Sequence, residues 1–248
     1  MICQSSLHLD SYDIKNVLNH SKTAHLGPIK VSDLGCEWMH QSHEGFVGAS
    51  RSFDGEDWWD FYSGDCTRQK RLKAPLKTNS EIVIKEPYSY LKKGSNYIDR
   101  NGGVTENRLN SIIYQSECIL NEDNQWVFSL SNSELQIEGK WLRPVSQPKT
   151  TVRLFAKVVS VKPKLISNIS EEDMAKFGLL VSKEVSDNIG NTEGLYFNYL
   201  DPSKQTKSIR ESFYSYVQHH YGEVNLTKAM FWFAEFQLIS VITKAIQK

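Results

Sequence analysis

The chain has 248 residues, and its 29 Lys and Arg balance its 29 Asp and Glu, so its formal net charge is zero. This balance excludes histone-like proteins and polybasic tails, because uniform attraction to polyanions requires an excess of cationic side chains. With 40% hydrophobic and 23% charged residues, the composition is that of a globular protein with a sizeable core. Long apolar runs and a secretory-signal pattern are lacking, and the cysteines are dispersed as in reduced proteins. We therefore expect a soluble, cytoplasmic protein with no membrane contact.

The first half of the chain predicts short elements. Residues 10–20 carry apolar side chains at helical spacing behind a capping residue, Ser11, and predict a helix. Residues 81–86 are rich in β-branched side chains and predict a strand. Two further strands are expected at 111–119 and 125–130.

The second half predicts longer elements. Residues 150–161 alternate between apolar and mixed positions and indicate a strand with one buried face. Ser170 begins a short helix with an acidic first turn, and residues 209–221 form a longer helix that Gly222 ends. Residues 230–239 are almost wholly apolar, which is typical of a strand buried on both faces.

Strands with separate short helices define an α+β class. No repeat of fixed period and no long linker is found in the sequence. We expect a single domain over residues 1–248, with insertions at about 33–80, 92–110 and 183–207.

Five sequence blocks are informative because of their order along the chain. They are a helix ending in Ser21-Lys22-Thr23, a strand ending in Ile84-Lys85-Glu86, the stretch Lys140-Trp141-Leu142-Arg143-Pro144 before Pro148 and Arg153, a helix over 169–178, and the closing strand MFWFAEFQLI. Together these blocks resemble the ASCH domain family, most closely the enlarged ASCH-like proteins of bacteriophages and prophages. The resemblance implies a PUA-like mixed β-barrel with short helices, long loop insertions and a cleft that binds nucleic-acid components.

The resemblance also indicates residues of that cleft. These candidates for nucleic-acid binding are Lys22, Thr23, Lys85, Glu86, Arg143, Arg153 and Trp232. Small family members that resemble amidohydrolases of acetylated cytidine use a Lys, a Thr and a Glu. Lys22 keeps the first position, but His25 stands at that Thr and Phe177 at that Glu.

Each candidate has a functional and a structural interpretation. Lys22 binds phosphate or acts as a base, or it stabilises the macrodipole of the preceding helix. Thr23 donates to a ligand, or it bonds to the backbone where the helix ends. Lys85 and Glu86 face a cleft, where the carboxylate accepts a base amino group, or both are solvated charges beside Pro87.

The arginines and the tryptophan have alternatives of the same kind. Arg143 and Arg153 clamp phosphates through their forked donors, or Arg153 forms an ion pair with a carboxylate such as Glu235. Trp232 stacks on a base or, as its apolar strand favours, belongs to the core.

Other chemistry is poorly supported. Cys36, His40 and His43 have the residue types of a zinc site, but no second ligand pair follows at a conventional spacing. Motifs for phosphate loops, serine hydrolases and zinc proteases do not occur in the sequence. We therefore expect no metal and no cofactor.

Three functions remain open. The first is binding of RNA or a modified nucleoside in the cleft, with weak salt dependence because one unstacked base is recognised. The second is an amidohydrolase or ribonuclease acting on modified bases or RNA, in which Lys22 is the base and His25 is the general acid or activates the nucleophile. The third is a protein-interaction scaffold whose insertions at 33–80 and 183–207 bind a partner.

Overall fold

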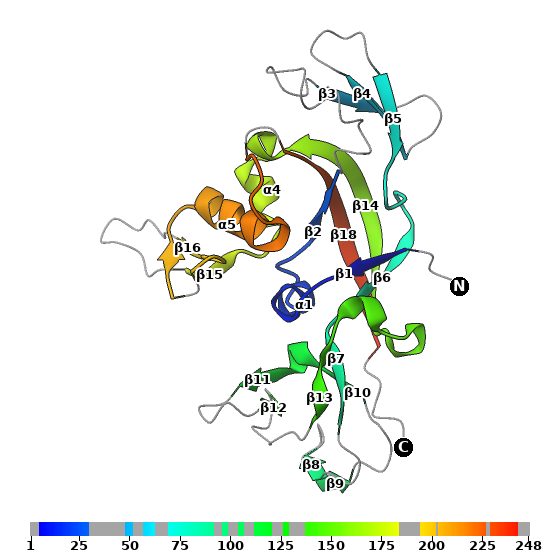
Figure 1. The fold of residues 1–248 in the computed structure, drawn as a ribbon, viewed down its shortest axis with the longest axis vertical. Helices are drawn as coiled ribbons and strands as arrows, with labels where there is room; N and C mark the ends of the chain where they lie inside the picture. Colours follow the sequence, from blue (N-terminus) through cyan, green and yellow to red (C-terminus); the bar gives the residue numbers. More distant parts are fainter. Residues whose placement is uncertain are drawn as a thin grey trace. The chain divides into compact units, whose positions relative to one another are not determined.

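The computed structural model describes twelve segments of the chain. They are residues 5–29, 48–51, 57–62, 69–91, 96–98, 104–106, 112–120, 126–128, 137–183, 194–201, 203–226 and 229–242. Secondary structure in these segments is mostly strand with few helices, which confirms the α+β class (Figure 1). No closed barrel is formed by the strands of these segments. Cys36, His40 and His43 lie outside them.

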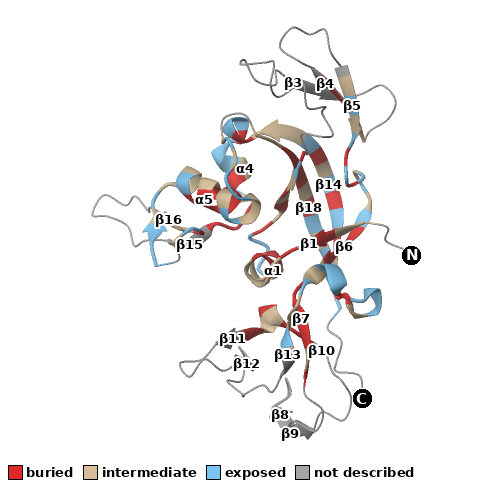
Figure 2. Ribbon diagram, in the orientation of Figure 1, coloured by how far each residue is buried: buried red, intermediate tan, exposed pale blue. Residues whose placement is uncertain are grey.

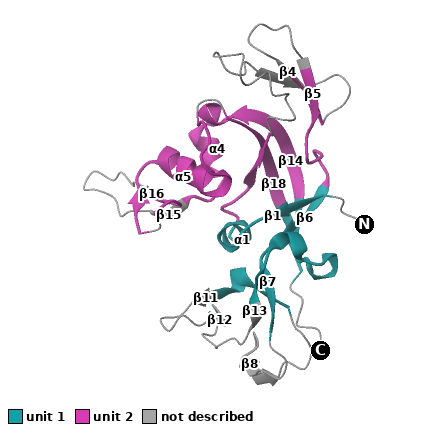
Figure 3. Cartoon of the chain, in the orientation of Figure 1, with its two compact units in different colours: residues 1–19, 81–156, 238–248 teal, residues 20–80, 157–237 magenta. Residues whose placement is uncertain are grey.

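The chain divides into two compact units, each assembled from separate stretches of sequence (Figure 3). Unit 1 comprises Met1–Asn19, Glu81–Ala156 and Leu238–Lys248, and unit 2 comprises His20–Ser80 and Lys157–Gln237. The single domain with three insertions stays a prediction. The described helices include none that is long and apolar enough to cross a membrane.

Unit 1 begins with strand β1 (Ser6–His8) and helix α1 (Ser11–Leu18). The cap of α1 is Asp10, whose carboxylate accepts a hydrogen bond from the backbone N–H of Asp13 at 2.8 Å. The predicted cap, Ser11, is instead the first residue of the helix, so that prediction is wrong by one position. Ile14 and Val17 form the buried stripe that the apolar spacing predicts.

Small sheets complete unit 1. Strand β6 (Glu81–Lys85) pairs in parallel with β1. The other strands of this unit are β7 (Tyr88–Leu91) between β10 (Ile112–Tyr114) and β13 (Ile137–Leu142), β8 (Asn96–Ile98) with β9 (Val104–Glu106), and β11 (Cys118–Leu120) with β12 (Trp126–Phe128). A 3₁₀ turn at Gln115–Glu117 divides the strand predicted over 111–119 into β10 and β11.

The two longest strands, β14 (Leu154–Leu165) and β18 (Met230–Val241), are neighbours in one sheet (Figure 1). Its strand order is β1-β6-β14-β18-β2, in which β2 is Ala24–Pro28. β14 begins four residues after the predicted start, because 3₁₀ turns at Pro144–Ser146 and Lys149–Thr151 precede it. Its residues Leu154, Ala156 and Val158 are buried, which confirms the alternation.

Unit 2 contains the other helices. α4 (Glu171–Ala175) is capped by Ser170, whose hydroxyl accepts from the N–H of Asp173, as the sequence predicts. α5 (Ile209–Tyr221) has the predicted bounds and ends at Gly222, whose φ of 76° suits glycine. A 3₁₀ turn at Ile166–Asn168 follows β14.

Unit 2 contains several small sheets and an aromatic core. Its strands include β2 (Ala24–Pro28) paired with β18, the sheet of β3 (Gly48–Arg51), β4 (Trp58–Tyr62) and β5 (Gln69–Lys73), and the sheet of β15 (Leu180–Lys183), β16 (Gly194–Phe197) and β17 (Gln205–Thr206). The core includes Phe177, Phe213 and Phe233, each at most 1% exposed. Figure 2 shows buried stretches on both α5 and β18.

Candidate nucleic-acid interface

The candidates from the sequence divide between the two units. Lys85, Glu86, Arg143 and Arg153 belong to unit 1, and Lys22, Thr23, His25 and Trp232 belong to unit 2. The shared cleft for all of them stays a prediction. The surroundings of each candidate within its own unit show what its side chain can reach.

Lys22 is enclosed by aromatic rings of unit 2. Only 1% of the residue is exposed, and its Nζ lies 4.9 Å from the ring centre of Phe177 and 4.8 Å from that of Tyr216. The ammonium also donates to Tyr216 Oη at 3.3 Å. The chain turns after α1 at His20, with a φ of 59°, and Lys22 then forms a β-bridge with Phe177. These contacts favour a structural cation–π role over phosphate binding in solvent.

The neighbouring candidates in unit 2 also serve the fold. The backbone N–H of Thr23 donates to Lys176 O at 2.7 Å, and its carbonyl accepts from the N–H of Phe236 at 2.9 Å. His25 is half-buried in β2 opposite Ala234. Trp232 is 6% exposed and meets the ring of Phe61 edge-on at 5.8 Å, which supports the core interpretation.

Arg153 and Glu86 form a buried ion pair in unit 1. The Arg153 Nε lies 2.7 Å from Glu86 Oε1 and its Nη2 lies 3.0 Å from Oε2, a forked geometry. Its Nη1 donates to Glu117 Oε1 at 2.5 Å. The side chain of Arg153 is 5% exposed and that of Glu86 is 0% exposed, so each is buried against the other. The ion-pair interpretation of Arg153 is therefore favoured, but with Glu86 and Glu117 as partners rather than Glu235.

The electrostatics of this pair follow from its burial and its hydrogen bonds. Burial alone lowers the pKa of Arg153, but hydrogen bonds to Glu86 and the charges of both carboxylates outweigh that effect and raise it. The guanidinium carbon lies 4.1 Å from the ring centre of Tyr114. Burial is also the largest cause that raises the pKa of Tyr114 to about 12. Arg153 therefore stays charged and Tyr114 stays a hydrogen-bond donor at neutral pH.

This buried network fixes the backbone of the segment between β13 and β14. The N–H of Glu86 donates to Gln147 Oε1 at 2.9 Å, and Gln147 Nε2 donates to Thr151 O at 3.2 Å. Tyr114 Oη donates to the same carbonyl at 2.5 Å. On the strand side, Tyr88 Oη donates to Ser146 O at 3.0 Å. The segment is thus held from within at three of its residues.

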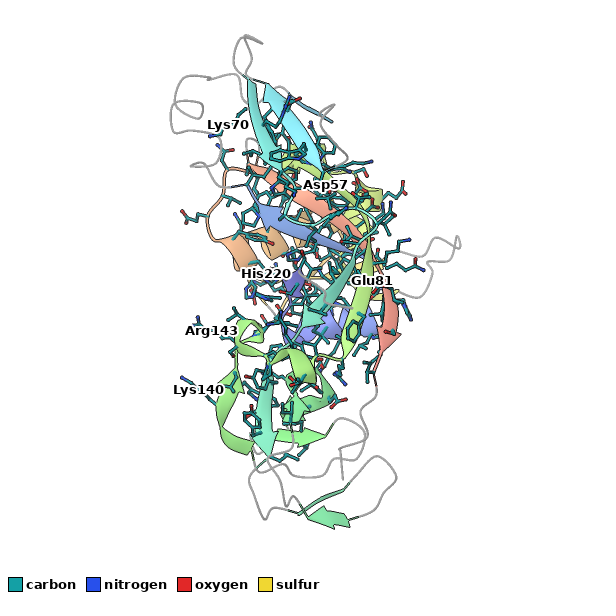
Figure 4. The ribbon with its side chains drawn as sticks, turned by 90° about the vertical axis from the view of Figure 1, so that its right-hand side faces the viewer. Asp57, Lys70, Glu81, Lys140, Arg143 and His220 are labelled. Atoms are coloured by element: carbon teal, nitrogen blue, oxygen red, sulfur yellow. The ribbon has the colours of Figure 1, made fainter. Side chains whose placement is uncertain are left out.

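Cations lie on the same segment and on the strands β6 and β13 next to it. Lys140, Arg143 and Lys149 are exposed, and the half-buried Lys85 donates its Nζ to Val145 O at 3.4 Å. Figure 4 shows Lys140 and Arg143 extending away from the ribbon on one side. We call Lys85, Lys140, Arg143 and Lys149 the cationic surface.

Two members of the cationic surface, Lys140 and Lys149, were not among the sequence candidates. Their signal is present in the sequence, because the stretch between Glu138 and Glu171 holds seven Lys or Arg and no Asp or Glu. A net charge of zero over the whole chain conceals this local excess.

A second polar network fastens α4 in unit 2. Lys176 Nζ lies 2.7 Å from Glu235 Oε1 and 3.0 Å from Asp173 Oδ1, and Lys164 also donates to Asp173. Burial raises the pKa of Asp173, but hydrogen bonds from Lys164 and Lys176 outweigh it and lower the pKa. Burial likewise raises the pKa of Glu235, but hydrogen bonds from Lys176 and Ser160 outweigh it and lower the pKa. The positive and negative charges of this network balance, which indicates a structural role.

No protein-family model, curated protein or solved structure matches the chain. Functional inference therefore depends on the geometry of the described residues.

Proposed function

We propose that the protein binds RNA through the cationic surface of unit 1. The observation that carries this proposal is that Arg143 and Lys149 are exposed on a segment that internal hydrogen bonds fix, with the exposed Lys140 on the strand before it and Lys85 of β6 bonded to one of its carbonyls. Phosphate groups bind such cations, and arginine adds forked hydrogen bonds. Because the segment is held by internal hydrogen bonds, little backbone entropy is lost when the ligand binds.

The size of the cationic surface limits the salt dependence. Four cations release at most four phosphate counterions, so the plot of log K against log salt has a slope no steeper than about −3 for a single strand. This dependence is stronger than that expected for a pocket that recognises one base. It is much weaker than that of a polybasic protein.

We further propose that the protein is of the ASCH and PUA-like type. The block order of the sequence supports this, and so does one contact in unit 2. Phe177, which stands at the Glu of the family's amidohydrolases, lies against Lys22, which stands at their Lys. An aromatic ring thus occupies the place of a catalytic carboxylate, and Lys22 is enclosed. This arrangement favours binding over the alternative of catalysis by Lys22 and His25.

The test measures affinity for a fluorescent 12-nucleotide RNA by anisotropy at several salt concentrations. Replacing Arg143 or Lys149 with Ala is expected to weaken binding and to reduce the salt slope by about 0.7 each, since each removes one phosphate contact. The matched control is Lys204→Ala in unit 2, where the lysine side chain is 73% exposed and paired with Asp201. Equal losses in all three variants, or none in any, would contradict the proposal.

A further inference from the structure

The sheet of unit 1 has a second face, of which the proposed RNA contacts use only Lys85. One face is packed in the core through Ile82, Ile84, Leu154 and Ala156, each 0% exposed. Because side chains alternate along a strand, Val83 and Lys85 of β6 and Phe155 of β14 lie on the opposite face. These three residues are only partly buried. We call this side of the sheet the outer face.

Strand β1 extends the outer face. The parallel register places Ser6 beside Val83 and His8 beside Lys85, and His8 is exposed. The proximity of Lys85 contributes to lowering the pKa of His8, after the larger effect of partial burial. The imidazole is therefore neutral at pH 7, which leaves a flat ring beside a cation.

Charge is distributed unevenly along the outer face. The exposed Glu81 begins β6, whereas Lys85 ends it and also belongs to the cationic surface. Phe155 lies two residues after the buried Arg153, near the start of β14. The apolar side chains of Val83 and Phe155 thus share a face with the cation Lys85.

We infer that the outer face stacks unpaired bases of the RNA, with Phe155 as the main stacking ring. The inference rests on the proposed function and specifies its ligand as a single strand. A strand whose phosphates bind Lys85 and Arg143 directs its bases to neighbouring surfaces. Phenylalanine and histidine rings on a sheet stack such bases with little sequence preference. A duplex has its bases already stacked on one another, so it gains only the phosphate contacts.

The charge of the boundary selects this occupant over an apolar protein segment. Lys85, with His8 beside it, lies on the same face as Phe155, and Phe155 belongs to the stretch after Glu138 that holds no acidic residue. A polyanion with flat apolar bases satisfies both features together. A protein partner is the competing occupant, and unchanged single-strand affinity in Phe155→Leu would favour it.

The test compares Phe155→Leu with Phe155→Tyr in the full chain. Leucine keeps an apolar side chain without a ring, and tyrosine keeps the ring. Anisotropy is measured with a 12-nucleotide single strand and with the 12-base-pair duplex of the same sequence. We expect Phe155→Leu to weaken single-strand binding between about fivefold and 150-fold, the range for one stacked base. Duplex binding should change less than twofold, and Phe155→Tyr should retain single-strand affinity.

The outcomes separate this inference from the proposed function. Unchanged single-strand affinity in Phe155→Leu, while Arg143→Ala weakens both ligands, overturns the stacking role and leaves the proposed function intact. Absence of binding to either RNA by the wild type overturns the proposed function itself. Circular dichroism confirms that each variant is folded, and ultraviolet crosslinking of a 4-thiouridine strand gives a second readout. Crosslinks within residues 153–157 support the inference, and crosslinks confined to unit 2 overturn it.

Discussion

Arg153 in unit 1 and Lys22 in unit 2 are both buried cations, yet their surroundings differ. Arg153 is held by two carboxylates and a hydroxyl, with Glu86 completely buried beside it. Lys22 lies between aromatic rings and donates to the hydroxyl of Tyr216. The contacts described for the first are charged, whereas those described for the second are two ring faces and a hydroxyl. The two sites should therefore respond very differently when one charge is removed.

The largest expected effect is at the ion pair. Glu86→Gln leaves the buried guanidinium of Arg153 beside a neutral amide, with the partly exposed Glu117 as its remaining carboxylate partner, so we expect a loss of about 3–5 kcal/mol in the free energy of unfolding. The measurement is urea denaturation followed by tryptophan fluorescence. The matched double variant Glu86→Leu with Arg153→Met removes both charges and should be markedly more stable than Glu86→Gln. A single variant as stable as the wild type would show that the pair does not form.

An intermediate effect is expected at Lys22. Lys22→Ala removes the aliphatic stem from a packed core, so it should cost about 2–4 kcal/mol. Lys22→Met retains the stem and removes only the ammonium, and we expect a change within about 1 kcal/mol, because the lost cation–π attraction is offset by relief of desolvation. Thermal and urea unfolding measure both. Equal destabilisation by the two variants would contradict this expectation. It would mean that loss of the ammonium, and not loss of the stem, destabilises the protein.

The smallest effect concerns acid. The pKa values of Asp173 and Glu235 are lowered in the folded protein, so their contribution to stability is present above their unfolded pKa values, near 4, and is lost as the pH falls through the folded values. Lys176→Met should flatten the stability profile below about pH 5 without changing its shape near pH 7. The profile comes from urea denaturation at successive pH values. An unaltered acid limb would exclude Lys176 as the cause of these shifts.

Local signals in the sequence predicted local structure well. Ser170 caps α4, Gly222 ends α5, and β6 occupies residues that are β-branched, because capping, positive φ and alternation are properties of neighbouring residues. The predicted start of β14 was too early, because two 3₁₀ turns, at Pro144–Ser146 and Lys149–Thr151, occupy the residues before the strand.

Partners distant in sequence were not predictable in the same way. The candidates Arg153 and Glu86 are 67 residues apart, and only the folded sheet brings them together. The same holds for Lys22 and Tyr216, which are 194 residues apart. A cationic residue in a motif therefore indicates a charge but not whether a carboxylate, a ring or solvent surrounds it. Local charge along the chain was the usable signal for the cationic surface, and the net charge obscured it.

Amide hydrogen exchange of the full chain, with and without the 12-nucleotide single strand, tests most directly whether unit 1 binds RNA. Slower exchange on RNA addition is expected in residues 81–85 and 137–156, which carry the cationic surface and Phe155. Residues 203–226 of unit 2 should exchange at the same rate in both samples. Protection confined to unit 2, with unit 1 unchanged, would contradict the assignment of RNA binding to the cationic surface.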